Sequence, residues 1–231
     1  MGAEFTISPA SAGDLAGFAS WYDLVEDLVL DEAAEVINAR YVEAFDSGIL
    51  GCALGIDDRK EVRAALDRAA AAGPEQTALI RHSLARSAIF VATDREGVAG
   101  VAELTPPIRA VEQIFRRLEQ QRASREAILD AQWKSMVQVS KLRLVAVRPD
   151  MRGRGVGSEL IEQALQLAAA SGVKQVYGQF SASPELARFY LERGFTVRDV
   201  GVPIKVVGGN TIQSRATEQL FYSMVRLRYR N

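Results

Sequence analysis

The sequence predicts an α/β fold (α+β by stricter naming), a mixed, mostly antiparallel twisted sheet flanked by helices. Three observations predict it. An alternating apolar run over residues 142–147 leads through a glycine-rich turn into a helical pattern, as a buried strand followed by a helix does. Residues 88–104 form two apolar runs around a short polar turn, the pattern of a β-hairpin. Residues 197–207 and 217–227 then form a closing antiparallel pair.

The N-terminal part of the chain predicts a short strand and then mainly helices. Residues 5–15 have the pattern of a strand followed by a helix start, and apolar residues continue at helical spacing as far as Phe45. Asp57 or Asp58 can cap a further helix that ends at Gly73-Pro74, and another helix follows. We therefore expect an extended N-terminal helical region over residues 14–87.

The second half predicts an insertion and a second strand–helix unit. Residues 108–138 have apolar positions at helical spacing with a hinge near Ser124, which indicates a helical insertion between the third and fourth strands. Residues 173–180 read as a strand, and Ser183 is the N-cap of the helix that follows. Without a repeat or a low-complexity linker, residues 1–231 are expected to form a single domain.

Charge is unevenly distributed along the chain. Residues 1–58 contain twelve acids and one base, Arg40, a net charge of −11 in a chain whose net charge is −1. Residues 108–143 contain eight bases and four acids, a net charge of +4. The acidic region either attracts a cationic substrate, forms a solvated helix face, or pairs with the basic insertion.

Composition excludes several classes of protein. The 231 residues are 48% hydrophobic and 25% charged, as in ordinary soluble domains. One cysteine, Cys52, and one histidine, His82, exclude an internal disulfide and a His/Cys metal cluster. The sequence has neither an apolar run of membrane length nor a signal pattern. We expect a cytoplasmic protein without a metal, and the abundance of arginine and alanine suggests a bacterial source.

The turn after Pro149 has the chemistry of a phosphate-binding site. Glycines at 153, 155 and 157 precede a helix, so backbone N–H groups and the helix dipole favour an anion there. The spacing is G-x-G-x-G, which matches neither the dinucleotide fingerprint G-x-G-x-x-G nor the P-loop. The turn therefore indicates a different phosphate-containing ligand.

The same stretch resembles the acyl-CoA site of the GCN5-related N-acetyltransferases, R/Q-x-x-G-x-G/A, in which Arg152, Gly155 and Gly157 match. The opening at residues 5–15 and the element from Ser183 to Phe195 are similar to other parts of that family. The resemblance is firm over 140–195 and does not extend to the insertions. It implies acetyl-CoA as cosubstrate and a sheet of the acetyltransferase type.

The resemblance also implies where the cofactor binds. Backbone groups of Val145, Ala146 and Val147 would hold the pantetheine arm, with the Val147 N–H as oxyanion donor. Ser183 stands where the family often has asparagine, which leaves its contact to the cofactor in question. The phosphates would be held by the turn and the first helical residues: Arg152, Gly153, Arg154, Gly155, Val156, Gly157 and Ser158.

Two side chains are candidates for proton transfer. By the resemblance, Tyr190 faces the cofactor sulfur and would donate its proton to the leaving thiolate; the alternative is that it only packs against the sheet. Glu103, near the end of the third strand, is the best candidate for the base that accepts the proton of the amine, although a surface position fits the pattern as well. Glu26 and Asp27 are the alternatives for the base.

The sequence thus predicts an acyl-CoA-dependent N-acetyltransferase that acts on a primary amine, in particular a cationic small molecule. Two alternatives remain: a protein or aminoacyl-tRNA acetyltransferase, and a non-enzymatic CoA-binding regulator. An overall pI near 6.0 speaks against a nucleic-acid partner, no membrane partner is expected, and a homodimer is left open.

Overall fold

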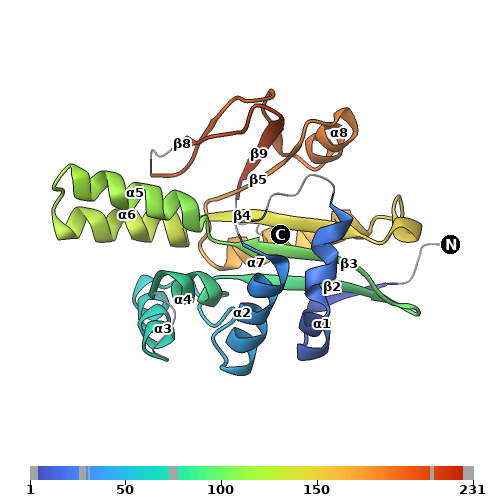
Figure 1. Ribbon diagram of the computed structural model, residues 1–231, viewed down its shortest axis with the longest axis horizontal. Helices are drawn as coiled ribbons and strands as arrows, with labels where there is room; N and C mark the ends of the chain where they lie inside the picture. Colours follow the sequence, from blue (N-terminus) through green and yellow to red (C-terminus); the bar gives the residue numbers. More distant parts are fainter. Residues whose placement is uncertain (1–4, 26–29, 31, 73–77, 209–210, 226–231) are drawn as a thin grey trace, which may run out of the picture.

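A seven-stranded sheet forms the centre of the molecule (Figure 1). The computed structural model describes residues 5–25, 30, 32–72, 78–208 and 211–225. The strand order is β1-β2-β3-β4-β5-β9-β6, and every neighbouring pair is antiparallel except β4 with β5, so the predicted fold class is confirmed. The strands are β1 (Thr6–Pro9), β2 (Ala88–Asp94), β3 (Gly97–Thr105), β4 (Val139–Val147), β5 (Gln175–Ser181), β6 (Thr196–Val197) and β9 (Glu218–Met224).

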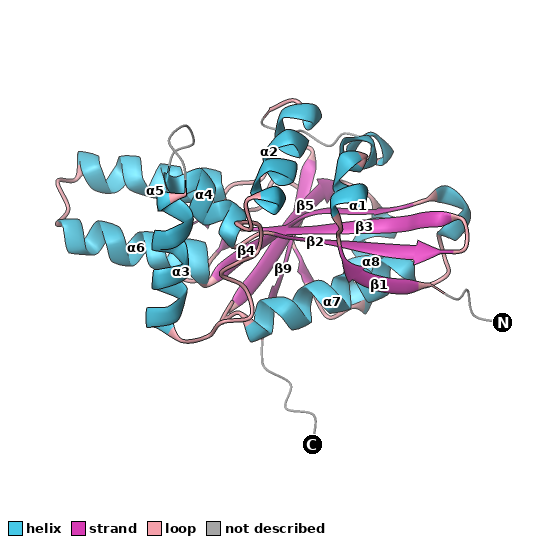
Figure 2. Ribbon diagram, turned by 90° about the horizontal axis from the view of Figure 1, so that it is seen from below, coloured by secondary structure: helices cyan, strands magenta, loops and turns pink. Residues whose placement is uncertain are grey.

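Helices cover both faces of the sheet, and Figure 2 shows α1 and α2 on the face opposite α7. One apolar core joins the N-terminal helices to β2, β3 and β4, and a second joins α7 and α8 to the other face. The N-terminal helices are α1 (Ala12–Ala16), the 3₁₀-helix η1 (Phe18–Leu24), α2 (Ala34–Asp46), α3 (Arg59–Ala71) and α4 (Ala78–Ala85), and the second face has α7 (Val156–Ala170) and α8 (Pro184–Glu192). Among the described helices, none is both long enough and apolar enough to cross a membrane.

Local sequence signals set several helix starts. Ser11 and Asp14 form a reciprocal capping box at α1, and the Asp58 side chain accepts hydrogen bonds from two backbone N–H groups at the start of α3, as predicted. The expected helix after residue 15 is instead a short α1 followed by η1, with the boundary at Gly17. The predicted break at Gly73-Pro74 lies outside the described residues.

The helical insertion between β3 and β4 is a pair of antiparallel helices, α5 (Ile108–Gln120) and α6 (Arg125–Val137). The pair projects beyond the sheet, at the left of Figure 1. Ser124 caps α6 by accepting a hydrogen bond from the Ala127 N–H, and Arg122 in the turn has φ 52°. The hinge predicted near Ser124 is therefore the turn between the two helices.

The predicted pairing of residues 197–207 with 217–227 is largely wrong. β9 pairs along its whole length with β5, and with β6 only at Thr196 and Val197. Beyond β6 the chain turns at Gly201, where φ is 74°, and it then forms a separate two-stranded sheet of β7 (Ile204–Lys205) and β8 (Thr211–Ile212). A left-handed glycine ends a strand, and the apolar pattern alone did not reveal that break.

β4 and β5 separate after a short parallel contact. They pair from Val139 with Gln175 to Lys141 with Tyr177, while β4 continues to Val147. At the end of this contact, a Cβ on Gly178 would lie 2.9 Å from the Leu142 carbonyl oxygen and 2.2 Å from the Phe221 ring. Only glycine fits at that point. The two strands therefore form a V whose apex is at Leu142 and Gly178, and whose open end leads to α7.

A buried arginine joins three segments beside the sheet. Arg86 is 1% exposed, and its guanidinium donates to the carbonyl oxygens of Ala53 at 2.7 Å, Val137 at 3.0 Å and Ser171 at 2.9 Å. Burial lowers the pKa of Arg86 to about 10, so the side chain stays charged at neutral pH. One cation thus satisfies carbonyl groups near the ends of α6 and α7 and in the loop after α2.

Replacing Arg86 by methionine should lower the free energy of unfolding by about 3 kcal/mol or more, because three buried carbonyls lose their donors. Urea unfolding measures this loss. Arg81→Met is the matched control, since Arg81 is also buried but, within the described part of the chain, makes a single long hydrogen bond of 3.4 Å to the Ala70 carbonyl. If Arg86→Met is as stable as Arg81→Met, Arg86 does not stabilise this junction.

Candidate active site

The glycine-rich turn leads from the open end of β4 into α7. Gly153 and Gly155 have φ of 75° and 91°, and Gly155 is the N-cap of α7. A Cβ at either glycine would meet nothing within 4 Å, so both backbones face open space. The first N–H groups of a helix have no acceptor within it and attract an anion. Arg152 and Arg154 are exposed beside them. This geometry fits a phosphate-containing cofactor.

The end of β4, the start of α7 and α8 meet at one point. A Cβ on Gly157 would contact the side chains of Val147 and Phe189, each at 3.5 Å. Arg193 lies on the Phe189 ring, 3.6 Å from its centroid, and its Nε donates to Ser158 Oγ at 2.9 Å. These contacts hold the start of α7 close to the end of α8.

The backbone of β4 alternates between its two neighbours. The Arg148 N–H donates to the Ala99 carbonyl of β3 at 2.9 Å, and the Ala146 carbonyl lies 3.0 Å from the Cβ position of Gly100, also on β3. Residues 145 and 147 therefore direct their N–H and carbonyl groups toward the gap between β4 and β5. Of the three predicted backbone positions, Val145 and Val147 face the gap and Ala146 faces β3. Arg152 Nε donates to the Val147 carbonyl at 3.2 Å.

Tyr190 lies in an aromatic cluster. Its ring stacks on Phe221 at a centroid distance of 3.8 Å and contacts Phe180 and Phe195 at 5.4 and 5.7 Å. Burial raises the pKa of Tyr190, so the phenol is protonated at neutral pH. Ser183, at the other end of α8, accepts a hydrogen bond from the Leu186 N–H at 3.3 Å and therefore caps the helix. Tyr190 therefore packs in the aromatic cluster and also keeps the phenolic proton that a proton donor needs.

Glu103 is completely buried and belongs to a network of four side chains. Its Oε2 accepts a hydrogen bond from Tyr22 at 2.9 Å, and its Oε1 accepts one from Tyr41. Arg143 Nη2 lies 2.8 Å from Oε1 and donates to the Tyr22 hydroxyl at 2.6 Å. Glu103 points away from Ala102 and Leu104, which pack in the core of the other face, as alternation predicts. A surface position for Glu103 is excluded.

A β-bulge brings Arg143 into this network. Glu103 pairs with Leu144 and Leu104 pairs with Leu142, so Arg143 is the extra residue of β4. Bulges redirect a side chain, and here the guanidinium is directed to the face that carries η1 and α2. Burial raises the pKa values of Tyr22 and Tyr41, so both hydroxyls keep their protons at neutral pH.

A cavity of about 230 Å³ adjoins the network. Tyr41 and Arg143 line it, whereas Tyr22 and Glu103 do not. The remaining lining residues come from the segment before α2 and from α2, α4, β3 and α5: Glu32, Ile37, Arg40, Ile80, Ser83, Leu84, Ser87, Thr105, Ile108, Arg109 and Glu112. The insertion therefore supplies one wall of the cavity.

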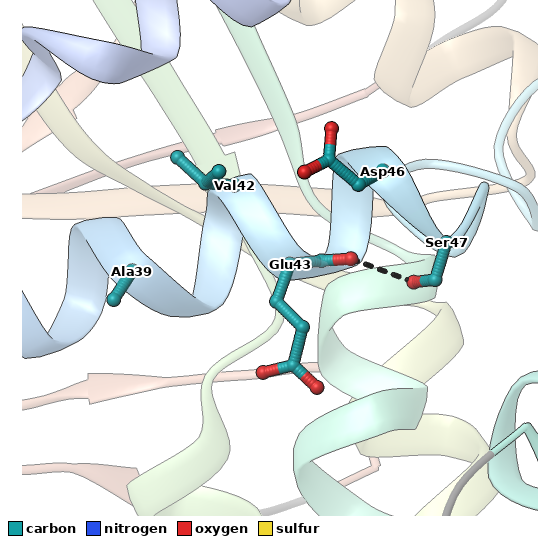
Figure 3. Close-up of a pocket in the computed structure, with 5 residues that line it drawn as sticks. All are labelled: Ala39, Val42, Glu43, Asp46 and Ser47. Atoms are coloured by element: carbon teal, nitrogen blue, oxygen red, sulfur yellow. Dashed lines mark hydrogen bonds between the residues drawn. The ribbon is translucent and has the colours of Figure 1, made fainter.

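A shallow depression on α2 does not bring functional groups together. Figure 3 shows Glu43 and Asp46 projecting from the helix in different directions, while Ser47 Oγ donates to the Glu43 carbonyl at 2.8 Å. It is lined by one helix and by none of the predicted site residues. The described residues contain no group of three or more His, Cys, Asp or Glu side chains placed to share a metal ion.

Charged groups of the N-terminal region have partners nearby. Glu32 forms a two-point ion pair with Arg40, with Nη2 and Oε1 2.8 Å apart, and this bond to Arg40 lowers the pKa of Glu32. Arg143 of the basic segment pairs with Glu103 and bonds to tyrosines of the N-terminal region. The alternative bases, Glu26 and Asp27, lie outside the described residues.

The sequence interpretation missed Tyr22 and Tyr41 as site residues. Both occupy apolar-face positions in the N-terminal helical pattern, where a tyrosine reads as a packing residue. A signal was present, because a carboxylate in a buried strand requires hydrogen-bond donors from the elements that cover it. Arg143 was also missed, since its orientation depends on the bulge.

Comparison with known proteins agrees with this geometry. Residues 85–197 match a family model described as "Acetyltransferase (GNAT) domain". A search of the curated proteins finds no match to this chain.

Several solved structures share the fold. A putative acetyltransferase of Salmonella typhimurium, solved with its cofactor acetyl-CoA, is 14% identical over 97% of this chain and 96% of that chain, with a TM-score of 0.52. A phosphinothricin acetyltransferase of Sinorhizobium meliloti, in complex with acetyl-CoA, is 13% identical over 96% of this chain and 88% of that chain, also at 0.52. A variant of the spermidine N-acetyltransferase of Vibrio cholerae is 13% identical over 95% and 93%, at 0.50.

Proposed function

We propose that this chain, whose residues 85–197 match the GNAT acetyltransferase model, transfers an acetyl group from acetyl-CoA to a primary amine of a small molecule. The observation that carries this proposal is the V between β4 and β5, which opens onto a glycine turn at the start of a helix. A long cofactor with phosphates at one end and a thioester at the other fits this shape.

The glycine turn and strand β4 bind different parts of acetyl-CoA. The N–H groups around Gly155 and the side chains of Arg152 and Arg154 attract the phosphates. The N–H and carbonyl groups of Val145 and Val147 face the gap and supply hydrogen bonds to the pantetheine amides. In this arrangement the Val147 N–H is the donor to the oxygen that becomes negative during attack.

Transfer requires two proton movements. The amine nitrogen attacks the thioester carbonyl carbon, the carbon–sulfur bond breaks, and the products are an amide and a thiolate. Tyr190 gives its phenolic proton to the departing thiolate. The phenolate that remains is the stronger base, because burial raises the pKa of Tyr190, and it takes a proton back from solvent before the next turnover. The amine loses its own proton to the protein, and Glu103 receives it in our proposal.

Glu103 does not line the cavity, so the proton must pass through an intermediate group. Tyr41 lines the cavity and donates its hydroxyl proton to Glu103 Oε1. Its hydroxyl oxygen can accept a proton from the amine while it passes its own proton to the carboxylate. The hydroxyl is therefore protonated before and after the relay, as its pKa, raised by burial, favours, and the proton of the amine is replaced by one that ends on Glu103.

Tyr41→Phe should lower kcat by about 10²-fold, because the path from the cavity to Glu103 is broken. Tyr22→Phe is the matched control, since Tyr22 also donates to Glu103 but does not line the cavity. Steady-state kinetics at several pH values measures both variants. If the two variants lose the same activity, the hydroxyls have a shared structural role and Tyr41 is not the proton path.

The acceptor in this proposal is cationic at its reacting nitrogen. Glu35, Glu43 and Asp46 are exposed on α2, within the region whose net charge is −11. Carboxylates at the surface attract an ammonium group over a Debye length of about 10 Å at 0.1 M salt. The attraction raises the local concentration of amine near the cavity.

A thiol-release assay tests the proposed function. Acetyl-CoA is offered with small amines, with a peptide and with charged tRNA, and we expect release with small amines whose KM rises with salt. Release of the thiol only with the peptide, or only with the charged tRNA, would show that the acceptor is not a small molecule. No release with any acceptor, while acetyl-CoA still binds, would identify a non-enzymatic CoA-binding protein.

A further inference from the structure

The cavity beside Arg143 lies at the apex of the V. The last close approach of β4 and β5 is at Leu142 and Gly178, and Arg143 is the next residue of β4. Its side chain leaves the sheet through the bulge and lines the cavity. A group held in the cavity is therefore next to the point where the gap between the strands ends.

The Arg143 guanidinium is fixed at one end and available at the other. Nη2 donates to Tyr22 at 2.6 Å and to Tyr41 at 3.4 Å, and it lies 2.8 Å from Glu103. Among the described residues, Nε is buried without a hydrogen-bond partner and Nη1 has none either, while the side chain is 22% exposed. An arginine held in one orientation by three partners presents its remaining donors in a fixed direction.

At Arg143 the cavity offers a ligand hydrogen-bond donors rather than acceptors. Three arginines line it, and a guanidinium has N–H donors but no acceptor. Glu32 already accepts both bonds from Arg40. The Ser87 hydroxyl lies within hydrogen-bond distance of the Ser83 carbonyl, at 2.8 Å, and of Thr105 Oγ1, at 3.0 Å. Glu112 is a second carboxylate of the lining, but at Arg143 a ligand group with oxygen acceptors fits and an ammonium group does not.

We propose that the cavity binds the acceptor with its reacting nitrogen toward Tyr41 and its other end on Arg143 Nη1, and that this other end carries an oxygen hydrogen-bond acceptor, a carboxylate or an amide carbonyl. This inference rests on the proposed function and narrows its substrate class. It also gives the insertion a role, because Ile108, Arg109 and Glu112 of α5 form the outer wall of the cavity. A volume of about 230 Å³ suits a ligand of amino-acid size.

Four probes of similar length test the chemistry of this end: 4-aminobutanoate, 4-aminobutanamide, pentylamine and 1,4-diaminobutane. Calorimetry in the presence of CoA measures their binding without requiring transfer. We expect the two oxygen-bearing probes to bind about 10- to 100-fold more tightly than pentylamine, as one hydrogen bond to a charged donor allows. Tighter binding of 4-aminobutanoate than of 4-aminobutanamide would indicate an anion site, and equal binding of the two would indicate a carbonyl site. Tighter binding of the diamine would overturn the inference.

Arg143→Lys removes the Nη1 donors and keeps a cation beside Glu103, so the buried carboxylate stays paired. We expect the preference for oxygen-bearing probes to fall to about one- to threefold in this variant. Arg63→Lys, at an exposed position on α3, is the control and should keep the full preference. A preference unchanged in Arg143→Lys would show that Arg143 does not hold the ligand oxygen.

Ile80→Phe tests the cavity independently of the arginine, because the larger side chain fills space that Ile80 lines. We expect binding of all oxygen-bearing probes to weaken at least tenfold while acetyl-CoA binding is unchanged. Unweakened probe binding would place the acceptor elsewhere. If the probes bind as expected but no thiol is released, the proposed function fails and the assignment of the cavity stands.

Discussion

Replacing Tyr190 by phenylalanine should lower kcat by about 10²- to 10⁴-fold with little change in KM for acetyl-CoA. The substitution removes one hydroxyl and keeps the ring that stacks on Phe221 at 3.8 Å. The leaving thiolate then departs without a proton donor, so the loss appears in the chemical step. Stability should change little, because the aromatic contacts with Phe180 and Phe195 remain.

The pH profile gives a second test of Tyr190. Burial raises the pKa of Tyr190, so the donor form persists above the ordinary pKa of tyrosine of about 10. We therefore expect no loss of kcat from this group between pH 8 and 10, and a descending limb only at higher pH. A limb near pH 10 in the wild type that disappears in Tyr190→Phe would contradict the buried position of this phenol.

Tyr222→Phe is the control for this experiment, because it removes a tyrosine hydroxyl from β9 and leaves α8 intact. It should retain wild-type kcat. If Tyr190→Phe keeps kcat within about twofold of the wild type, Tyr190 is a packing residue and the thiolate is protonated by another group.

Replacing Gly155 by glutamate should weaken acetyl-CoA binding by at least about 100-fold. The new side chain would enter the open space in front of the α7 N-terminus, where Cβ at present meets nothing within 4 Å. Its carboxylate would occupy the position that favours the phosphates and would repel them. Isothermal titration calorimetry measures the loss directly.

Gly172→Glu is a matched control for the backbone. Gly172 has φ 71°, compared with 91° for Gly155, its Cβ would likewise meet nothing within 4 Å, and it follows the other end of α7. Both variants therefore place glutamate in a left-handed conformation, at a similar cost in stability. We expect only Gly155→Glu to lose acetyl-CoA binding. Equal binding by both variants would show that the turn does not hold the cofactor.

Local signals predicted the part of the site that depends on local structure. The strand, the glycine turn and the helix over 142–170 are set by residues close in sequence, and the structure has them in the predicted order. Either Asp57 or Asp58, and Ser183, were predicted as caps for the same reason, and Asp58 and Ser183 are the caps in the structure. The hairpin of β2 and β3 followed from its two apolar runs around a polar turn.

The sequence alone did not predict contacts between residues that are far apart in the chain. The network around Glu103 joins residues 81, 62 and 40 positions apart, namely Tyr22, Tyr41 and Arg143. Its geometry depends on the one-residue bulge between β3 and β4, which no local pattern marks. Arg86 is a similar case, since its three carbonyl partners come from three separate segments.

The pairing of β9 with β5 was missed for a related reason. The apolar runs near residues 197–207 and 217–227 identify strand-forming segments, but they do not specify partners. The first run pairs as strand β6 only over Thr196–Val197, and β9 extends the main sheet beside β5. Strand order in a sheet depends on the whole chain, so adjacency in the sequence does not identify the partner of a strand.

We propose that this chain moves an acetyl group from acetyl-CoA to a small primary amine. The most direct test follows one reaction by two readouts, the free thiol of CoA and the mass of the amine. We expect one acetylated amine for each thiol released, with both signals lost in Tyr190→Phe and in Gly155→Glu. Thiol release without an acetylated amine, or no release although acetyl-CoA binds, would contradict it.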